Sequence, residues 1–365
     1  MRSDEPAPLL AVENLATSFS TPRGVLRAVD GVSFTLAPSE ALGVVGESGS
    51  GKSVLVRTVM NILPRQAQVA AESRILFEGH EVRDRRGAAA RHFWGAEVAM
   101  VFQDPMTSLN PVRTIGRQLT EPMRHHLGLS RRAADTRAAE LLAEVGISEP
   151  VRRLRQYPHE LSGGMRQRVM IAIALSCSPK LLIADEPTTA LDVTVQKEIL
   201  DLLARLRTEL RMAMILISHD LSVVSGRTDR TMVMYAGRVA EIGPTAELFQ
   251  HTRHPYTAAL LRSTPRIDEP SHTPLEVIAG GAPDLVHPPP GCRFAPRCRQ
   301  ARPRCQQEDP ALADEPGHRY ACFYPVGTEA GDRALAENLA DGRTGAGLDL
   351  APVPTDRSAL DGAVN

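Results

Sequence analysis

Residues 46–53 of this 365-residue chain combine three glycines and three serines with one lysine, directly after the apolar run 41–45. Their order is Gly46, Glu47, Ser48, Gly49, Ser50, Gly51, Lys52 and Ser53. Glycines at this spacing let successive backbone N–H groups turn toward one anion, and a helix that begins here adds the positive end of its dipole. The segment is therefore typical of a phosphate-binding loop. Lys52 would neutralise the β- and γ-phosphates of a nucleotide, and Ser53 would ligate Mg²⁺.

Further polar side chains stand where other apolar, strand-like runs end. Asp185 and Glu186 follow residues 181–184, while His219 and Gln103 each close another such run. Because open α/β sheets bind their ligands at the carboxyl ends of strands, we expect these side chains to meet. Asp185 would hold Mg²⁺, Glu186 would polarise an attacking water, and His219 would contact the γ-phosphate. Gln103 would reach Mg²⁺ or the water.

A second glycine-rich segment, residues 161–165, has the sequence Leu-Ser-Gly-Gly-Met. Ser162, Gly163 and Gly164 offer a hydroxyl group and backbone N–H groups as donors for phosphate. The chain therefore has two separate segments suited to phosphate, and this indicates two nucleotide-handling surfaces.

Short apolar runs and helical patterns must position these residues. We expect strands within residues 8–45, 75–82, 98–102, 181–184, 213–218 and 231–242. Helices are expected at residues 53–63, 131–144 and 193–207, and residues 113–180 have helical patterns. Strands that alternate with helices imply a mostly parallel sheet with crossover helices. After residue 243, Pro, Arg and Cys become frequent and the strand signals fade.

Charge and hydropathy exclude several classes of protein. The chain has 42 basic and 43 acidic residues, a net charge of −1. General binders of nucleic acid or of anionic membranes need a basic excess, so this balance argues against both. No apolar run approaches the roughly 18–20 residues that cross a bilayer, and the first residues have no apolar segment typical of a signal peptide. We expect a cytosolic chain whose membrane role would depend on a partner.

Four of the five cysteines cluster in the last third of the chain. Cys292, Cys298, Cys305 and Cys322 are separated by 5, 6 and 16 residues, whereas Cys177 stands alone. In a reducing cytosol such a cluster favours a metal site over disulfides, and four thiolates suit either Zn²⁺ or a 4Fe–4S cluster. The chain has no Cys-x2-Cys pair, which counts against common zinc ribbons and against the ferredoxin pattern. Free thiols are the third possibility.

The order of these motifs resembles the ATP-binding subunit of ABC transporters. The phosphate loop, Gln103, the segment 161–165, Asp185-Glu186, the Ala-Leu-Asp at 190–192 and His219 follow one another as in that family. Three longer strings, residues 102–111, 157–168 and 254–257, resemble its oligopeptide, dipeptide and nickel importer branch. The resemblance covers roughly residues 8–325.

The resemblance implies an α/β fold: a P-loop NTPase core with an N-terminal antiparallel β-subdomain, an inserted helical subdomain and a small cysteine-containing C-terminal extension. The implied boundaries are an N-terminal tail at 1–7, an ATPase domain at 8–258 with its helical subdomain at about 105–180, and the extension at 259–325. Residues 326–365 are rich in Ala, Gly and Asp, and we expect a disordered tail there.

The resemblance also assigns roles to matching positions. Phe19 would stack on adenine, a place where the family more often has Tyr. Ser162, Gly163 and Gly164 would bind the γ-phosphate held by the loop of an opposite subunit, and Asp192 would lie at the dimer seam. The loop 104–113 would receive a membrane partner. Some members of this branch hold a 4Fe–4S cluster in a similar cysteine set.

The function implied is that of an ATP-hydrolysing, energy-coupling subunit of a binding-protein-dependent importer, with di- and oligopeptides as the expected cargo. The implied partners are two transmembrane permeases, a second ATPase subunit, which is either a paralogue or a copy of this chain, and an extracytoplasmic substrate-binding protein. No nucleic acid is implied. The subunit would lie at the cytoplasmic face of the cell membrane as a peripheral protein. Its cofactors would be ATP and Mg²⁺.

Two rival interpretations are weaker. Soluble ABC ATPases of translation or DNA repair usually carry two cassettes or a long coiled coil, and this chain has one cassette and no long heptad run. An iron–sulfur regulatory subunit that binds ATP but hardly hydrolyses it would not need Glu186 and His219. Nickel and glutathione remain open as cargo.

Overall fold

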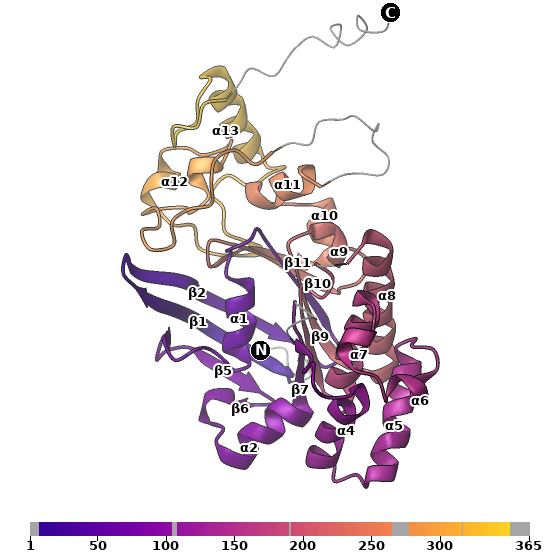
Figure 1. Cartoon of the computed structure of the whole chain (residues 1–365). Helices are drawn as coiled ribbons and strands as arrows, with labels where there is room; N and C mark the ends of the chain where they lie inside the picture. Colours follow the sequence, from indigo (N-terminus) through magenta and orange to yellow (C-terminus); the bar gives the residue numbers. More distant parts are fainter. Residues whose placement is uncertain (1–6, 104–107, 190, 265–276, 316, 351–365) are drawn as a thin grey trace, which may run out of the picture.

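The computed structural model describes residues 7–103, 108–189, 191–264, 277–315 and 317–350. Figure 1 shows two sheets, a group of helices beside the larger sheet, and a C-terminal extension drawn in orange to yellow. Within the described ranges, every helix is too short or too polar to cross a membrane.

The larger sheet has eight strands in the order β12-β13-β11-β10-β3-β9-β8-β7. Its strands are β3 (Ala41–Val45), β7 (Val98–Val101), β8 (Leu181–Asp185), β9 (Ala213–Ser218), β10 (Arg230–Tyr235), β11 (Arg238–Pro244), β12 (Ala313–Glu315) and β13 (His318–Tyr320). Strands β10, β3, β9, β8 and β7 are parallel to one another. Every residue of β3, β8 and β9 is buried, which explains their continuous apolar sequences.

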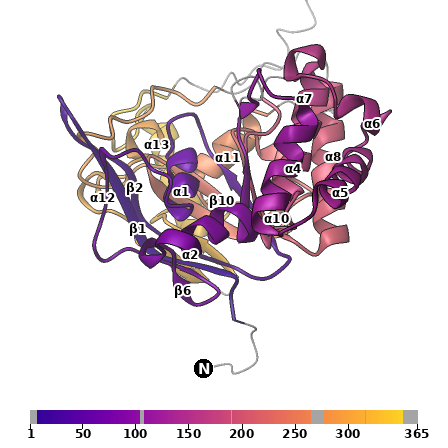
Figure 2. The same ribbon diagram turned by 60° about the horizontal axis from the view of Figure 1, so that its bottom comes forward.

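The smaller sheet is antiparallel and covers the helix that follows the phosphate-type loop. It contains β1 (Leu10–Thr21), β2 (Gly24–Leu36), β4 (Ala67–Val69), β5 (Arg74–Phe77) and β6 (His80–Glu81). Helix α1 (Lys52–Val59) places Leu55 and Val56 in one buried cluster with residues of both sheets. Figure 2 shows α1 beside β1 and β2. The loop before α1 is thus held by two sheets at once.

The helical region follows β7 and packs on the larger sheet as a second buried cluster. Its helices are α4 (Ile115–His126), α5 (Arg131–Glu144), α6 (Pro150–Arg153) and α7 (Gly163–Leu175), followed after β8 by α8 (Val193–Leu210). Helix α5 begins where Ser130 accepts a hydrogen bond from Ala133 N, and it spans the residues predicted for it. Residues 104–107, the first part of the predicted docking loop, lie outside the described residues.

Shorter helices connect the main elements. They are η1 (Val82–Asp84), α2 (Gly87–His92), η2 (Phe93–Glu97), η3 (Pro158–Glu160), α9 (Leu221–Val224), α10 (Thr245–Gln250) and α11 (Pro255–Arg262). The extension adds η4 (Ala295–Arg297), α12 (Arg304–Gln307) and α13 (Glu329–Ala340).

The C-terminal extension is joined to the larger sheet. Strand β13 pairs with β11 and with β12, so strands continue beyond residue 243, where the sequence signals fade. At this junction Glu241 is 0% exposed. Its carboxylate accepts hydrogen bonds from the backbone N–H groups of Arg253 (2.7 Å) and His254 (3.0 Å), and His318 Nε2 lies 2.7 Å away. One buried carboxylate therefore connects β11, α11 and β13.

The structure differs from two expectations about the C-terminal part. The predicted boundary between residues 258 and 259 falls inside α11. The tail predicted to be disordered from residue 326 contains α13, which Thr328 caps by accepting a hydrogen bond from Gly331 N at 3.1 Å. Asn338 of α13 is 0% exposed and donates to the carbonyls of Arg299 (2.8 Å) and Ala301 (3.1 Å), so buried polar contacts hold this helix on the extension. Residues 351–365 lie outside the described residues.

Candidate active site

The carboxyl ends of four parallel strands meet at one cavity of about 590 Å³. The loop 46–53 follows β3, Asp185 and Glu186 lie at the end of β8, His219 follows β9, and Gln103 follows β7. The cavity is lined by Leu26, Ala28, Ser48, Gly49, Ser50, Gly51, Lys52, Ser53, Val54, Gln103, Glu186, Thr189, His219 and Leu285. The fold thus brings together the segments that the strand-end argument predicted to meet.

Two glycines of the loop lie against backbone atoms of neighbouring strands and leave no room for a side chain. A Cβ atom on Gly51, whose φ is +102°, would lie 2.2 Å from Ala28 O. A Cβ atom on Gly46 would lie 2.2 Å from Met234 O. Any larger residue at either position would push the loop off the strands that support it.

Lys52 is 4% exposed and lies inside the loop. Its Nζ donates to the carbonyls of Gly46 (2.6 Å) and Glu47 (3.0 Å). Burial lowers the pKa of Lys52, while the nearby carboxylates of Glu186 and Asp185 act in the opposite direction. The ammonium group is therefore held by backbone carbonyls at the mouth of the cavity, where an anionic ligand could take their place.

Ser53 and Asp185 form a pair of oxygen ligands. Ser53 Oγ donates to Asp185 Oδ1 at 3.0 Å. Burial raises the pKa of Asp185, and the hydrogen bond from Ser53 and the charge of Arg57 oppose that rise. A hydroxyl and a carboxylate are hard oxygen donors of the kind that Mg²⁺ prefers. The pair would suit a Mg²⁺ ion.

Three side chains converge on one oxygen of Glu186. Gln103 Nε2 donates to Glu186 Oε2 at 3.1 Å, and Thr189 Oγ1 donates to the same oxygen at 3.1 Å. His219 Nδ1 lies 3.4 Å from it. Glu186 itself has φ +46°, an uncommon left-handed conformation for a residue with a side chain. The carboxylate is therefore fixed in direction by residues from three strand ends, as a group that orients water would need to be.

Comparison with known proteins identifies the family. The family described as ABC transporter matches residues 29–189, and the family described as Oligopeptide/dipeptide transporter, C-terminal region, matches residues 240–305. The dipeptide transport ATP-binding protein DppD of Bacillus subtilis is 47% identical over 302 residues, which cover 83% of this chain and 90% of DppD. The chain belongs to the ABC transporter family.

Another relative and two solved structures agree with this membership. The oligopeptide transport ATP-binding protein OppD of Haemophilus influenzae is 48% identical over 299 residues, or 82% of this ABC transporter subunit and 92% of OppD. The structure of cbiO1 from Clostridium perfringens, part of the ABC transporter complex cbiONQ, has a TM-score of 0.58 and 28% identity, with coverage of 67% of this chain and 92% of that chain. The ATP-binding cassette MJ0796, solved with ADP and Pi, shares the fold at a TM-score of 0.58 and 24% identity, with coverage of 65% and 98%. The predicted fold class and family are confirmed.

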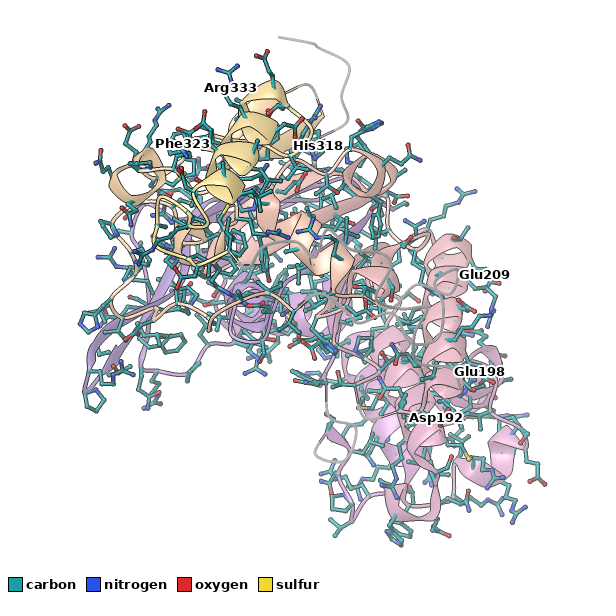
Figure 3. All side chains as sticks on the ribbon, turned by 90° about the horizontal axis from the view of Figure 1, so that it is seen from above. Asp192, Glu198, Glu209, His318, Phe323 and Arg333 are labelled. Atoms are coloured by element: carbon teal, nitrogen blue, oxygen red, sulfur yellow. The ribbon has the colours of Figure 1, made fainter. Side chains whose placement is uncertain are left out.

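The glycine-rich segment 161–165 of this ABC transporter subunit does not line the cavity. Ser162 caps α7 by accepting a hydrogen bond from Met165 N at 3.3 Å, and Asp192 caps α8 in the same way from Val195 N at 3.0 Å. Ser162, Gly163 and Asp192 are exposed. Figure 3 shows Asp192 on α8 in the helical region, far from the labelled residues of the extension. The structure thus leaves these two helix N-termini open to solvent; Ala190 lies outside the described residues.

Phe19 is not among the residues that line the cavity, and the cavity includes residues that the sequence did not single out. Phe19 is half-buried on β1 and faces Leu26 across the strand pair, and Leu26 is the one that lines the cavity. Thr189, a neighbour of Glu186, was not predicted. Leu285 comes from the extension, where its carbonyl accepts a hydrogen bond from Arg27 N at 3.2 Å. No local sequence pattern identifies Leu285 as part of this site.

The four clustered cysteines of this ABC transporter subunit gather around one small cavity. Cys292, Cys298, Cys305 and Cys322 all line a space of about 10 Å³. Burial raises the pKa of Cys292 to about 11 and that of Cys322 to about 12. All four are free thiols, and among the described residues no group of three or more His, Cys, Asp or Glu side chains is arranged as a metal site. The structure therefore brings the thiols together without supporting the predicted iron–sulfur or zinc site.

Proposed function

We propose that this chain is the ATP-hydrolysing, energy-coupling subunit of a binding-protein-dependent importer for di- and oligopeptides. The observation that carries the proposal is the cavity where the loop 46–53 meets Glu186, with Gln103 and His219 beside that carboxylate. Relatives named as dipeptide and oligopeptide transport proteins share almost half of its residues over most of its length. They also support the choice of peptides as cargo.

Each residue of the site has a role in phosphoryl transfer to water. The backbone of the loop 46–53 cradles the phosphates, and Lys52 leaves its two carbonyl partners to neutralise the β- and γ-phosphates. Ser53 and Asp185 hold Mg²⁺, which when bound offsets phosphate charge. Glu186 accepts the proton of the attacking water, while Gln103 and His219 orient that water and the γ-phosphate. Phe19 is proposed to lie near adenine, beside Leu26, which lines the cavity.

A second ATPase subunit completes the site. Ser162, Gly163 and Gly164 lie at the exposed N-terminus of α7, whose N–H groups and dipole suit a phosphate held by a facing subunit. Asp192 lies at a similarly exposed helix start and would meet that subunit at the seam. Two ATP molecules would be enclosed between two such chains. The complex would further contain two permeases and an extracytoplasmic binding protein, with this subunit on the cytoplasmic face of the membrane.

Uptake by whole cells tests the proposed cargo. In cells that lack this chain, we expect uptake of a radiolabelled dipeptide or tripeptide to fall to background and to return when the wild-type chain is supplied. Supplying the Glu186→Gln chain should not restore it. Uptake of radioactive nickel and of labelled glutathione is measured in the same cells. If uptake of nickel or of glutathione were lost while peptide uptake stayed normal, that solute would be the cargo instead of peptides. Normal uptake of all three solutes would contradict an import role.

We further propose that the cysteine cavity holds a 4Fe–4S cluster, with Zn²⁺ as the alternative ligand. The support for this proposal is that four cysteines line one small space and that four thiolates suit either group. The raised pKa values of Cys292 and Cys322 mean that binding must release protons from these thiols. The role would be structural or redox-sensing.

Metal analysis of the chain purified without oxygen tests this second proposal. We expect a brown protein with iron and acid-labile sulfide in equal amounts, and we expect Cys298→Ser to lose both. Cys177→Ser is the matched control, because Cys177 is also buried but lies outside the cavity, and it should keep the metal. Zinc without iron would select the alternative ligand, and a metal-free chain would contradict both.

A further inference from the structure

The C-terminal extension touches the phosphate-binding loop at two places. Ala282, Pro283 and Leu285 line a small space of about 20 Å³ together with Glu47, Ser48, Gly49 and Ser50 of the loop. The second contact is an ion pair between Arg297 and Glu47. The extension is therefore part of the wall against which the loop rests.

The ion pair between Arg297 and Glu47 is bidentate. Nη1 of Arg297 donates to Glu47 Oε2 at 2.8 Å, and Nη2 donates to Glu47 Oε1 at 3.0 Å. The guanidinium group also donates from Nε to Ala279 O at 2.8 Å and lies 3.3 Å from Tyr235 Oη. The Arg297 side chain is 7% exposed. Paired, charge-assisted hydrogen bonds of this kind fix direction as well as distance, so the Glu47 side chain has little freedom to turn.

The rest of Glu47 is held from two further sides. Its backbone N–H donates to Tyr256 Oη at 2.8 Å, and Tyr256 is 0% exposed. Its carbonyl accepts the hydrogen bond from Lys52 Nζ at 3.0 Å. The position of Glu47 therefore fixes one of the two carbonyls that hold the lysine of the loop. A shift of the Arg297 guanidinium would therefore move Glu47 and, with it, the backbone of the loop that carries Lys52.

Arg297 also lies directly beside the cysteine cavity. It ends η4, and the next residue is Cys298, which lines that cavity. Phe294, at the start of the same turn, lines the cavity too, and its ring centroid lies 5.3 Å from that of Tyr256. One short helical turn thus includes Cys298 of the cavity and Arg297, which pairs with the Glu47 side chain. It begins at Phe294, whose ring lies near Tyr256, the residue that accepts the hydrogen bond from the Glu47 backbone.

Arg293 makes a matching connection from the other end of the turn. It follows Cys292, and its guanidinium group donates to Ala236 O and to the carboxylate of Asp30. The next residue after Ala236, Gly237, donates its N–H to Ser50 O at 2.9 Å. Arg297 therefore pairs with the loop directly, whereas Arg293 is connected to it through the backbone of residues 236 and 237.

We infer that Arg297 is a positioning residue for the phosphate-binding loop and that it couples the cysteine cavity to nucleotide binding. The inference rests on the proposed nucleotide site at residues 46–53. Arg297 acts through Glu47 and does not line the active-site cavity itself. Because coupling between two sites is reciprocal, nucleotide bound to the loop must also change the turn that carries Cys298.

Nucleotide affinity of the full chain tests the positioning role. Arg297→Met removes the charge and keeps much of the length of the side chain, and we expect it to raise the KM and Kd for ATP about tenfold, the size expected when one charge-assisted pair is lost. The kcat should change less than about twofold, because Glu186 and its partners are untouched. Arg297→Lys should restore part of the affinity. Glu47→Gln should weaken binding similarly, and combining it with Arg297→Met should add little.

Arg333→Met is the matched control for this change. Arg333 belongs to the same extension and pairs with Glu329, but its side chain is 64% exposed, and Figure 3 shows it on the outer side of α13. Its loss should leave ATP affinity unchanged. Equal affinities of the Arg297→Met and Arg333→Met chains would overturn the positioning role. If Lys52→Ala binds ATP as tightly as the wild type, the proposed nucleotide site fails instead.

Hydrogen exchange measured by mass spectrometry tests the coupling. We expect saturating Mg–ATP to slow exchange of the amides in residues 293–298 of the wild-type chain, where Arg297 N and Cys298 N donate within the turn. In the Arg297→Met chain, saturated with ATP, this slowing should be lost. Equal slowing in both chains, or none in the wild type, would overturn the coupling. The measurement also shows whether the variant has kept its fold elsewhere.

Discussion

Replacing Glu186 by Gln should lower the rate of ATP hydrolysis by about 10²- to 10⁴-fold, the usual contribution of a positioned general base. The reason lies in the geometry: Gln103 and Thr189 both donate to Glu186 Oε2 at 3.1 Å, so a carboxylate oxygen is required where they point. An amide keeps the size of the side chain but cannot accept a proton from water. Binding of ATP should persist, since Lys52 and the loop are unchanged.

Steady-state ATPase assays of the assembled transporter, with ATP binding measured in parallel, check this expectation. Glu209→Gln is the matched control: it makes the same chemical change on α8, at an exposed residue that pairs with Arg205 and does not line the cavity. Figure 3 shows Glu209 and Asp192 toward opposite ends of that helix. Turnover of that control should equal the wild type. Unchanged turnover of the Glu186→Gln chain would remove Glu186 from the catalytic role.

Replacing Lys52 by Ala should weaken ATP binding by about 10²-fold, which corresponds to about 3 kcal/mol and to the loss of hydrogen bonds from a charged donor. Lys52 supplies the positive charge inside the loop, and its burial means that little water screens this charge. Fluorescent ATP binding measures the change. Lys180→Ala is the control, because Lys180 forms an exposed ion pair with Glu78 on another surface, and its loss should leave binding intact.

The pH dependence of binding gives the same prediction a second readout. Burial lowers the pKa of Lys52, so in the nucleotide-free chain this group loses its charge at a lower pH than an exposed lysine would. ATP binding should therefore weaken as the pH rises into the alkaline range. The Lys180→Ala chain should show the same decline, and the Lys52→Ala chain should not. If ATP binding weakened equally at alkaline pH in the wild-type, Lys180→Ala and Lys52→Ala chains, the titrating group would be one other than Lys52.

The sequence predicted which side chains meet at the strand ends because parallel strands impose a simple rule. Buried strands are continuous apolar runs, and their carboxyl ends share one edge, so the sequence alone was enough to place Asp185, Glu186, His219 and Gln103 together. The rule predicts at which edge of the sheet these residues lie, but it does not predict which side chains line the cavity. For that reason it could not show that Leu26 lines the cavity while Phe19, its neighbour across the strands, does not.

Contacts between segments that are far apart in the chain could not be predicted from the sequence. Arg297 and Glu47 are separated by 250 positions, and nothing near either residue marks its partner. Helix α13 did leave a local signal, since Thr328 can cap a helix whose first turn carries Glu329 and Asp332. The expectation of disorder rested instead on the Ala, Gly and Asp composition of this segment. The buried hydrogen bonds of Asn338, which hold the helix in place, depend on the folded extension.

The carboxylate of Glu241 bears on how far the chain can be shortened from its C-terminal side. Its partners are the backbone of Arg253 and His254 and the ring of His318, and only the last belongs to the far end of the extension. A gene shortened before residue 318 would keep a charged group in the interior with one partner removed, and would also leave β11 unpaired on one side. Burying a charge that has lost a partner is strongly unfavourable. Loss of β13 is therefore expected to destabilise the larger sheet itself and not only the extension.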